Sequence, residues 1–199
     1  MKLLKLLSTS LILLVLGTGL LFAKNPVVEM HIEIQNKHKP EHGVVKIELF
    51  EKESPVTVKN FLGYVNSGFY NGTIFHRVIN RFMIQGGGFD RNLSQKKTRS
   101  PIKNEAHNKL NNTVGTIAMA RTNNIHSATA QFFINVNNNL FLDHKNKQKY
   151  GYAVFGRVIS GMDIVHKIQS VKTGKKGVFS DVPLAPVLIK KVVLSRSYQ

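Results

Sequence analysis

The 199-residue sequence contains no cysteine and no tryptophan, and only 11 acidic residues against 28 lysines and arginines. The absence of cysteine excludes disulfides, thiolate zinc sites, iron–sulfur clusters and cysteine nucleophiles. The scarcity of acidic residues gives a formal charge of +17, which favours association with anionic surfaces but specifies neither fold nor chemistry. Intrinsic disorder is not expected, because 42% of the residues are hydrophobic and a chain of this length buries a core of ordinary size.

The first 23 residues have the pattern of a secretory signal peptide. Lys2 and Lys5 precede an apolar stretch at 11–22, and Ala23 provides a small residue for cleavage. We therefore expect a signal peptide at 1–23 and a mature domain at 24–199, which keeps a charge of +15 after the two lysines are removed. The alternative is an uncleaved anchor, since the apolar run approaches the ~20 residues that a membrane-spanning helix needs.

Hydrophobic periodicity predicts a chain rich in strands. Apolar and polar residues alternate at 28–34 and at 45–49, so these runs form a hairpin across the polar segment 36–43. Further apolar runs predict strands at 73–79, 82–85, 115–120, 131–136, 152–158 and 187–195.

Two helices are expected, far apart in the sequence. Ser54 and Pro55 start the first, with apolar residues at helical spacing up to Gly68, and the second begins near Ser160 and continues through Ile168. Because strands and helices do not alternate, the pattern predicts a mainly β fold with an antiparallel sheet or barrel.

Three basic clusters lie between the expected elements, at 95–99, 145–149 and 172–176. We interpret them as polar loops at a solvated rim. A nucleic-acid site is disfavoured, because no aromatic residues are interleaved with the charges for base stacking.

The segment FHRVINRFMIQGGGF at 75–89 places Arg77 inside an apolar strand, where a charge is unusual. An arginine partly desolvated among apolar side chains makes strong hydrogen bonds to a substrate oxygen. The residues alone leave a second interpretation open, in which Arg77 pairs with one of the few carboxylates or extends to the rim.

Other patterns give weaker indications. In MARTNNIHSATAQFFINV at 119–136, Phe132 and Phe133 should point to opposite faces of a strand, one to the core and one to a surface groove. The glycines at 86–88 lack the Lys-Ser/Thr ending of a phosphate-binding loop. His38 and His42 make a poor zinc pair, because the proline between them prevents a regular helix. No metal site is therefore expected.

The segments at 75–89 and 119–136 are followed by FLDH at 141–144 and YAVFGRV at 152–158. Together, in this order, they resemble the cyclophilin-type peptidyl-prolyl cis–trans isomerases. The similarity covers about residues 27–196, and together with the signal sequence it is greatest to the periplasmic cyclophilins of Gram-negative bacteria. The resemblance implies a closed eight-stranded antiparallel barrel capped by two α-helices, with a substrate groove on the outside of the barrel.

The resemblance also implies the site. Arg77 matches the family's catalytic arginine. The residues that match the family's pocket for the proline ring are Phe82, Met83, Phe133 and Leu142. Gln85, with His76 beside it, matches a polar residue that positions the arginine and the substrate backbone. The edge that binds the peptide matches Ala120, Arg121 and Gln131.

The sequence departs from the common family pattern at several of these positions. Phe141 stands where many eukaryotic members have tryptophan, and Tyr152 where they have histidine. Arg121 replaces a more usual asparagine, and Asn80-Arg81 replaces the common Pro-Gly. These differences are typical of bacterial members and bear on drug sensitivity more than on catalysis.

The expected function is isomerisation of X-Pro bonds in exported, proline-containing polypeptides, by non-covalent stabilisation of the twisted amide. We expect a periplasmic monomer without cofactor, metal, membrane anchor or specific nucleic acid, and with weak binding of cyclosporin. Two other functions stay open at this point: a holding chaperone whose isomerase activity is incidental, and an adhesin or nucleic-acid binder that acts through the basic surface.

Overall fold

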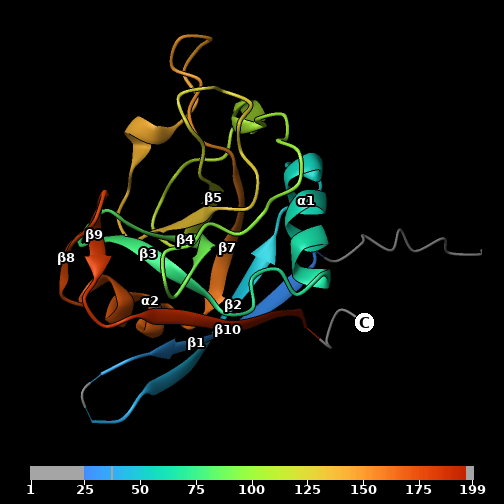
Figure 1. Cartoon of the computed structure of the whole chain (residues 1–199). Coiled ribbons are helices and arrows are strands. Elements are labelled where there is room, and N and C mark those ends of the chain that lie inside the picture. The colour runs from blue at the N-terminus through green and yellow to red at the C-terminus, as the bar shows by residue number, and fades with distance from the viewer. Residues whose placement is uncertain (1–24, 37, 196–199) are drawn as a thin grey trace, which may run out of the picture.

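The computed structural model describes residues 25–36 and 38–195, and the expected signal peptide lies outside these residues. Eight antiparallel strands close into a barrel in the order β1-β10-β3-β4-β6-β5-β7-β2 (Figure 1), which confirms the predicted architecture. The barrel strands are β1 Val27–Ile34, β2 Glu41–Leu49, β3 Thr73–Ile79, β4 Met83–Asp90, β5 Thr116–Met119, β6 Phe132–Asn135, β7 Val154–Ser160 and β10 Val187–Leu194.

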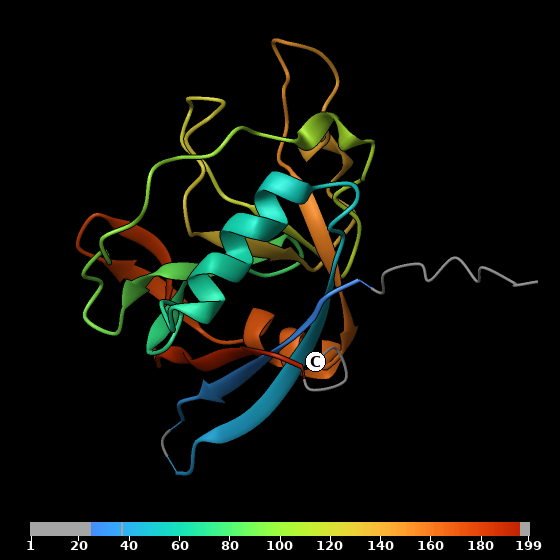
Figure 2. The same cartoon turned by 90° about the vertical axis from the view of Figure 1, so that its right-hand side faces the viewer.

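Two α-helices, α1 Pro55–Asn66 and α2 Met162–Gln169, accompany the barrel, and Figure 2 shows α1 lying across its front. Helix α2 begins after the position expected from sequence, because Gly161 has a φ of 89° and approaches the Val44 carbonyl too closely to carry a side chain. Within the described residues, no helix is long and apolar enough to cross a membrane. Two short 3-10 helices, Ala106–Asn108 and Leu140–Leu142, lie in the connections.

The interior of the barrel is filled by the inward-facing residues of the strands and by one face of α1. Phe61 of α1 packs against Tyr70, Phe132 and Phe155, with ring centroids 5.1 to 5.9 Å apart. Burial of such aromatic side chains is the main stabilising contribution in a core of this kind.

The first turn of α1 is capped by a distant carboxylate. Pro55 occupies the start of the helix as predicted, but the Ser54 hydroxyl donates to the Val154 carbonyl instead of capping the helix. Glu105, buried in the loop before β5, accepts hydrogen bonds from the backbone N–H of Val56 (3.2 Å) and Thr57 (2.8 Å). A carboxylate at this end also complements the helix dipole.

The basic cluster at 95–99 is not only a solvated rim, as the sequence suggested. Lys96 donates to the Phe69 carbonyl and lies over its ring, while Arg99 donates to the Gly63 carbonyl at 2.9 Å. Gly63 lies in the last turn of α1, and Phe69 follows the end of the helix. These cations therefore stabilise the negative end of the helix.

The cluster at 172–176 is a correction to the sequence analysis, which treated it as a loop. Thr173–Lys176 forms β8, which pairs with β9 (Phe179–Pro183) in a two-stranded sheet outside the barrel. Strand β9 packs against β3 (Figure 1). Phe179 contacts Phe89 with ring centroids 5.2 Å apart. The short, mostly exposed β8 has no apolar alternation, so its pairing depends on tertiary contacts.

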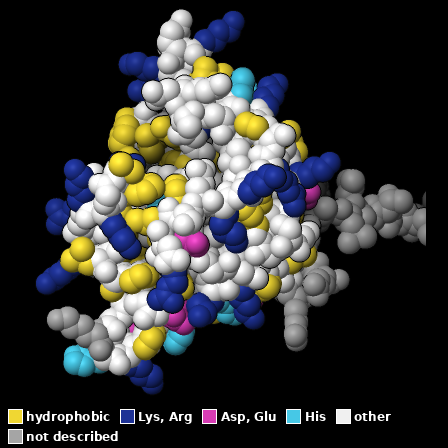
Figure 3. All heavy atoms as spheres, viewed as in Figure 1, with side chains coloured by type: hydrophobic (Ala, Val, Ile, Leu, Met, Phe, Trp, Pro, Cys, Tyr) yellow, Lys and Arg dark blue, Asp and Glu magenta, His cyan; other side chains and the backbone are white. Residues whose placement is uncertain are grey.

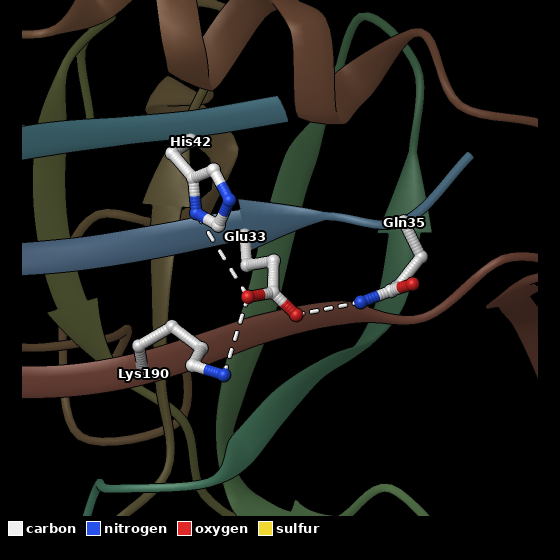
Figure 4. A network of polar contacts seen from close by, with 4 residues as sticks. All are labelled: Glu33, Gln35, His42 and Lys190. Atoms are coloured by element: carbon white, nitrogen blue, oxygen red, sulfur yellow. Dashed lines mark hydrogen bonds and ion pairs between the residues drawn. The ribbon is translucent and has the colours of Figure 1, made fainter. Parts of the chain in front are cut away.

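A polar network joins three neighbouring strands on the outside of the barrel (Figure 4). The Glu33 carboxylate of β1 lies 3.2 Å from Lys190 Nζ of β10 and 3.8 Å from His42 Nδ1 of β2, and it accepts a hydrogen bond from Gln35. The hydrogen bond from Lys190 lowers the pKa of Glu33 below its ordinary value of 4.5. His42, one of the two histidines considered above as zinc ligands, therefore lies near a carboxylate that already contacts Lys190 and Gln35.

Candidate active site

A pocket of about 260 Å³ opens on the outside of the barrel, where β3, β4, β5 and β6 lie side by side. In Figure 3 hydrophobic side chains line a hollow in this face, and basic side chains greatly outnumber acidic ones around it. The lining residues were all predicted from sequence: Arg77, Phe82, Met83, Gln85, Ala120, Arg121, Phe133, Leu142 and Tyr152.

The floor of the pocket is apolar and is separate from the barrel core. Met83 and Phe133 are buried in a cluster that also includes the half-buried Phe82 and Leu142. Phe132, the neighbour of Phe133, belongs instead to the core cluster, so the two rings point to opposite faces as the strand pattern predicted. The pocket therefore presents a rigid apolar surface that is supported by the sheet itself.

Arg77 provides the charge at the edge of this floor. It lies on β3 with a side chain 44% exposed, and its Nε is 3.6 Å from Oδ2 of Asp181 on β9. The pairing with a carboxylate, which the sequence left open, is thus present, and Arg77 lines the pocket as well. Its contact with a substrate stays a prediction.

Gln85 and Gln131 form the polar wall beside Arg77. The Gln85 side-chain amide donates to Gln131 Oε1 at 3.0 Å. Gln131 fits against β4 only because residue 88 is glycine, since a Cβ there would lie 2.4 Å from Gln131 Cγ. The glycines at 86–88 therefore belong to a strand and make room for side chains, in agreement with their exclusion as a phosphate loop.

Arg121 closes the opposite wall and is itself fixed in place. Its Nε donates to the Gly151 carbonyl at 3.1 Å and its Nη1 to the Thr122 carbonyl at 2.9 Å. The guanidinium also lies 4.6 Å from the centre of the Tyr152 ring, which in turn packs edge-on against Phe133 at 5.6 Å. Ala120, at the end of β5, donates its N–H to the Gln131 carbonyl, which joins the two walls.

Comparison with known proteins agrees with this geometry. Residues 30–194 match the family described as "Cyclophilin type peptidyl-prolyl cis-trans isomerase/CLD". The chain is 57% identical to peptidyl-prolyl cis-trans isomerase B of Escherichia coli over 77% of its length and 95% of that protein. It is 52% identical to a peptidyl-prolyl cis-trans isomerase of Acinetobacter baylyi over 90% of its length and 92% of that protein. An isomerase of Streptomyces antibioticus is 58% identical over 74% of this chain and 90% of that protein.

The chain belongs to the cyclophilin-type peptidyl-prolyl cis–trans isomerases. It is therefore an enzyme that acts on proline-containing peptides, and the resemblance read from its motifs is confirmed. Among residues 25–36 and 38–195 of this cyclophilin, no three His, Asp or Glu side chains lie close enough together to hold a metal ion.

His76 does not line the pocket of the cyclophilin, although it precedes Arg77. Its ring is buried against Phe89, with centroids 4.6 Å apart, and within the described residues its Nδ1 has no hydrogen-bond partner. Burial, assisted by the nearby charge of Arg77, lowers the pKa of His76 from 6.5 to about 4. The imidazole is consequently neutral at pH 7 and adds no second positive charge beside Arg77.

Phe141 lies at the rim of the pocket and not in its floor. Its side chain is 67% exposed, and its ring stacks on Phe82 with centroids 5.7 Å apart. An exposed ring stacked on Phe82 extends the apolar surface beyond the pocket itself.

A buried asparagine network supports the pocket, and the sequence analysis missed it. Asn139 donates to the Phe82 carbonyl (2.8 Å) and to Asn135 Oδ1 (2.7 Å). Asn135 in turn donates to Asn112 Oδ1, and Asn112 donates to Asp143 beside the 3-10 helix that carries Leu142. The network thus connects two walls of the pocket. The dense run of asparagines at 135–139 was the available signal.

Sequence reasoning also missed Asp181. It is the only acidic residue in 164–199, and that isolation was the available signal. Its proximity to Arg77 could not be inferred, because it depends on the β8–β9 hairpin packing against β3.

Proposed function

We propose that the pocket beside Arg77 is the place where this cyclophilin isomerises X-Pro bonds. The observation that carries the proposal is a cationic hydrogen-bond donor at the edge of an apolar slot of about 260 Å³. Met83, Phe133 and Leu142 offer a surface for the proline ring, while Gln85 and Arg121 offer polar groups to the peptide backbone on either side.

The chemistry suits this set of residues. Rotation about a peptide bond has a barrier of ~18–20 kcal/mol, because the nitrogen lone pair is conjugated with the carbonyl. In the twisted state the nitrogen becomes pyramidal and accepts a hydrogen bond from Arg77, an interaction absent from both planar states. A charge-assisted bond of ~1.5–3 kcal/mol supplies only about one or two powers of ten in rate. Desolvation and fixed substrate geometry supply the rest.

The proposed reaction breaks no covalent bond, so it requires no nucleophile, metal or cofactor from the protein. We expect the purified mature protein to keep full isomerase activity after exhaustive chelation. Activity that is lost on chelation and returns with a divalent ion would overturn this part of the proposal.

The proposed substrates are exported polypeptides, and the proposed location is the periplasm. The proposed location rests on the signal-peptide pattern at 1–23, which leaves 24–199 as the mature domain. We propose that this domain acts as a monomer. N-terminal sequencing of the exported protein should begin near Lys24. An intact Met1 in a membrane fraction would instead establish the anchored form.

Binding in the pocket is tested by titrating the protein with two short peptides that differ only in one residue, X-Pro against X-Ala. NMR shifts of the Met83 and Leu142 methyl groups should move with the X-Pro peptide and much less with the X-Ala peptide. Equal shifts with both peptides would contradict a proline slot.

The holding chaperone remains a second candidate, because an apolar groove also binds unfolded chains. Suppression of aggregation of a proline-free client would support it. The isomerase proposal instead expects that proline-free clients gain no benefit.

A further inference from the structure

We propose that Asp181 on the β8–β9 hairpin is a positioning residue for Arg77, holding the guanidinium in the orientation that isomerisation uses. This inference rests on the role of Arg77 proposed above. The contact is between Arg77 Nε and Asp181 Oδ2, 3.6 Å apart. Because Nε is one edge of the guanidinium, a carboxylate there leaves the terminal nitrogens free to act as donors toward the pocket.

The need for such a partner follows from the surroundings of Arg77. Its side chain is nearly half exposed, and an unrestrained arginine samples many rotamers. Gln85, the residue paired with Arg77 across β3 and β4, donates its side-chain amide to Gln131. Within the described residues, Asp181 is the only side chain that forms an ion pair with Arg77.

The hairpin that carries Asp181 is anchored directly behind the site. Phe179, two residues before Asp181, packs edge-on against Phe89, and Phe89 packs against the buried ring of His76. His76 is the chain neighbour of Arg77 on β3. A continuous set of aromatic contacts therefore fixes the distance between the hairpin and the strand that bears Arg77.

The backbone of Asp181 provides an independent indication. Its φ is 59°, in the left-handed region that side-chain-bearing residues rarely adopt, although aspartate tolerates it better than most. Strained backbone of this kind gathers at functional sites, where surrounding contacts hold it in place. Here the conformation occurs at the residue whose carboxylate meets Arg77.

Asp181 carries an isolated negative charge in a basic part of the chain. Asp181 is the single acidic residue of 164–199, a segment that carries Lys175 and Lys176 on the same hairpin. An exposed ion pair contributes little to stability, so the effect of this pair should appear in the kinetics of isomerisation and not in unfolding.

Two variants separate the carboxylate from the backbone. Asp181→Asn keeps the shape and tolerates positive φ, while Asp181→Gly removes the side chain and relieves the backbone. Both should lower kcat/KM for a short X-Pro peptide about three- to tenfold, mainly through kcat. Thermal unfolding should be unchanged in Asp181→Asn, which keeps the backbone preference of aspartate. Asp163→Asn, which removes the same charge from the exposed face of α2, should keep wild-type kinetics.

The decisive comparison repeats Asp181→Asn in an Arg77→Ala background. If Asp181 acts through Arg77, the second substitution changes the residual activity no further. A further drop in that background would overturn the positioning role, as would unchanged or raised activity of the single variant, which would indicate that the carboxylate is idle or competes with substrate. If Arg77→Ala alone is fully active, the proposed function fails as well, so the two failures are distinguishable.

Discussion

Phe141 stacks on Phe82 with ring centroids 5.7 Å apart and planes inclined by 21°, and its phenyl ring is exposed. The family resemblance matches this position to the tryptophan of many eukaryotic members. An indole N–H can donate a hydrogen bond to a bound cyclic peptide such as cyclosporin, whereas a phenyl ring has no donor and a smaller area. We expect the loss to cost on the order of 1–3 kcal/mol in binding, roughly ten- to hundredfold in Kd.

Inhibition curves of the wild type and Phe141→Trp, measured with peptide turnover alongside, test this expectation. Phe141→Trp should be inhibited at about ten- to hundredfold lower cyclosporin concentration. Turnover of a short X-Pro peptide should change little, because its proline ring would rest on Met83 and Phe133. Unchanged inhibition would show that Phe141 does not contact the drug.

The buried His76 should make the protein less stable in acid. Its pKa is about 4 in the folded state against 6.5 for an exposed histidine, so between these values the unfolded chain binds more protons. Stability therefore rises with pH through this window, and the full contribution of His76 is present above pH 6.5. Between pH 7 and pH 4 the wild type should lose about 3 kcal/mol more than His76→Phe, which cannot titrate.

Urea unfolding at several pH values measures this difference. His76→Phe keeps a ring to pack on Phe89, so its folding should be preserved. Parallel stability curves of the two proteins from pH 7 to pH 4 would mean that burial does not lower the pKa of His76, because the folded and unfolded states would then bind protons equally.

The buried carboxylate that caps α1 should contribute to stability. Glu105→Ala removes the acceptor for the N–H groups of Val56 and Thr57 and leaves a buried helix end without a partner. We expect the free energy of unfolding to fall by about 2–3 kcal/mol. Glu53→Ala, at an exposed position in the turn before the helix, is the matched control and should change stability by less than about 0.5 kcal/mol. Equal effects of the two substitutions would argue against the cap.

The barrel was predictable because local patterns and tertiary contacts agree in it. The alternation from Val28 to Ile34 places every second residue in the core, and the Phe132-Phe133 pair divides between core and pocket as strand geometry requires. The pocket residues could be predicted only from the family motifs. Nothing in the local pattern of Leu142 or Tyr152 indicates that they line the same pocket as Arg77.

The features that escaped prediction all depend on contacts between distant segments. The β8 strand has no apolar alternation of its own and forms only on β9. Glu105 caps a helix 48 residues earlier in the chain, and Asp181 reaches Arg77 only through the packing of the hairpin. Asn139 likewise supports Phe82 from 57 residues away. Such pairings are set by the folded topology, which periodicity does not encode.

The central claim is that Arg77 accelerates X-Pro rotation by donating to the twisted amide, and a protease-coupled isomerisation assay of Arg77→Ala tests it most directly. The account predicts that kcat/KM for a short X-Pro peptide falls at least about tenfold, since one power of ten corresponds to ~1.4 kcal/mol of lost transition-state stabilisation. Circular dichroism should show an unchanged fold, and Arg77→Lys should also be poor because an ammonium lacks the planar fork. A correctly folded Arg77→Ala protein with the wild-type rate would contradict the account.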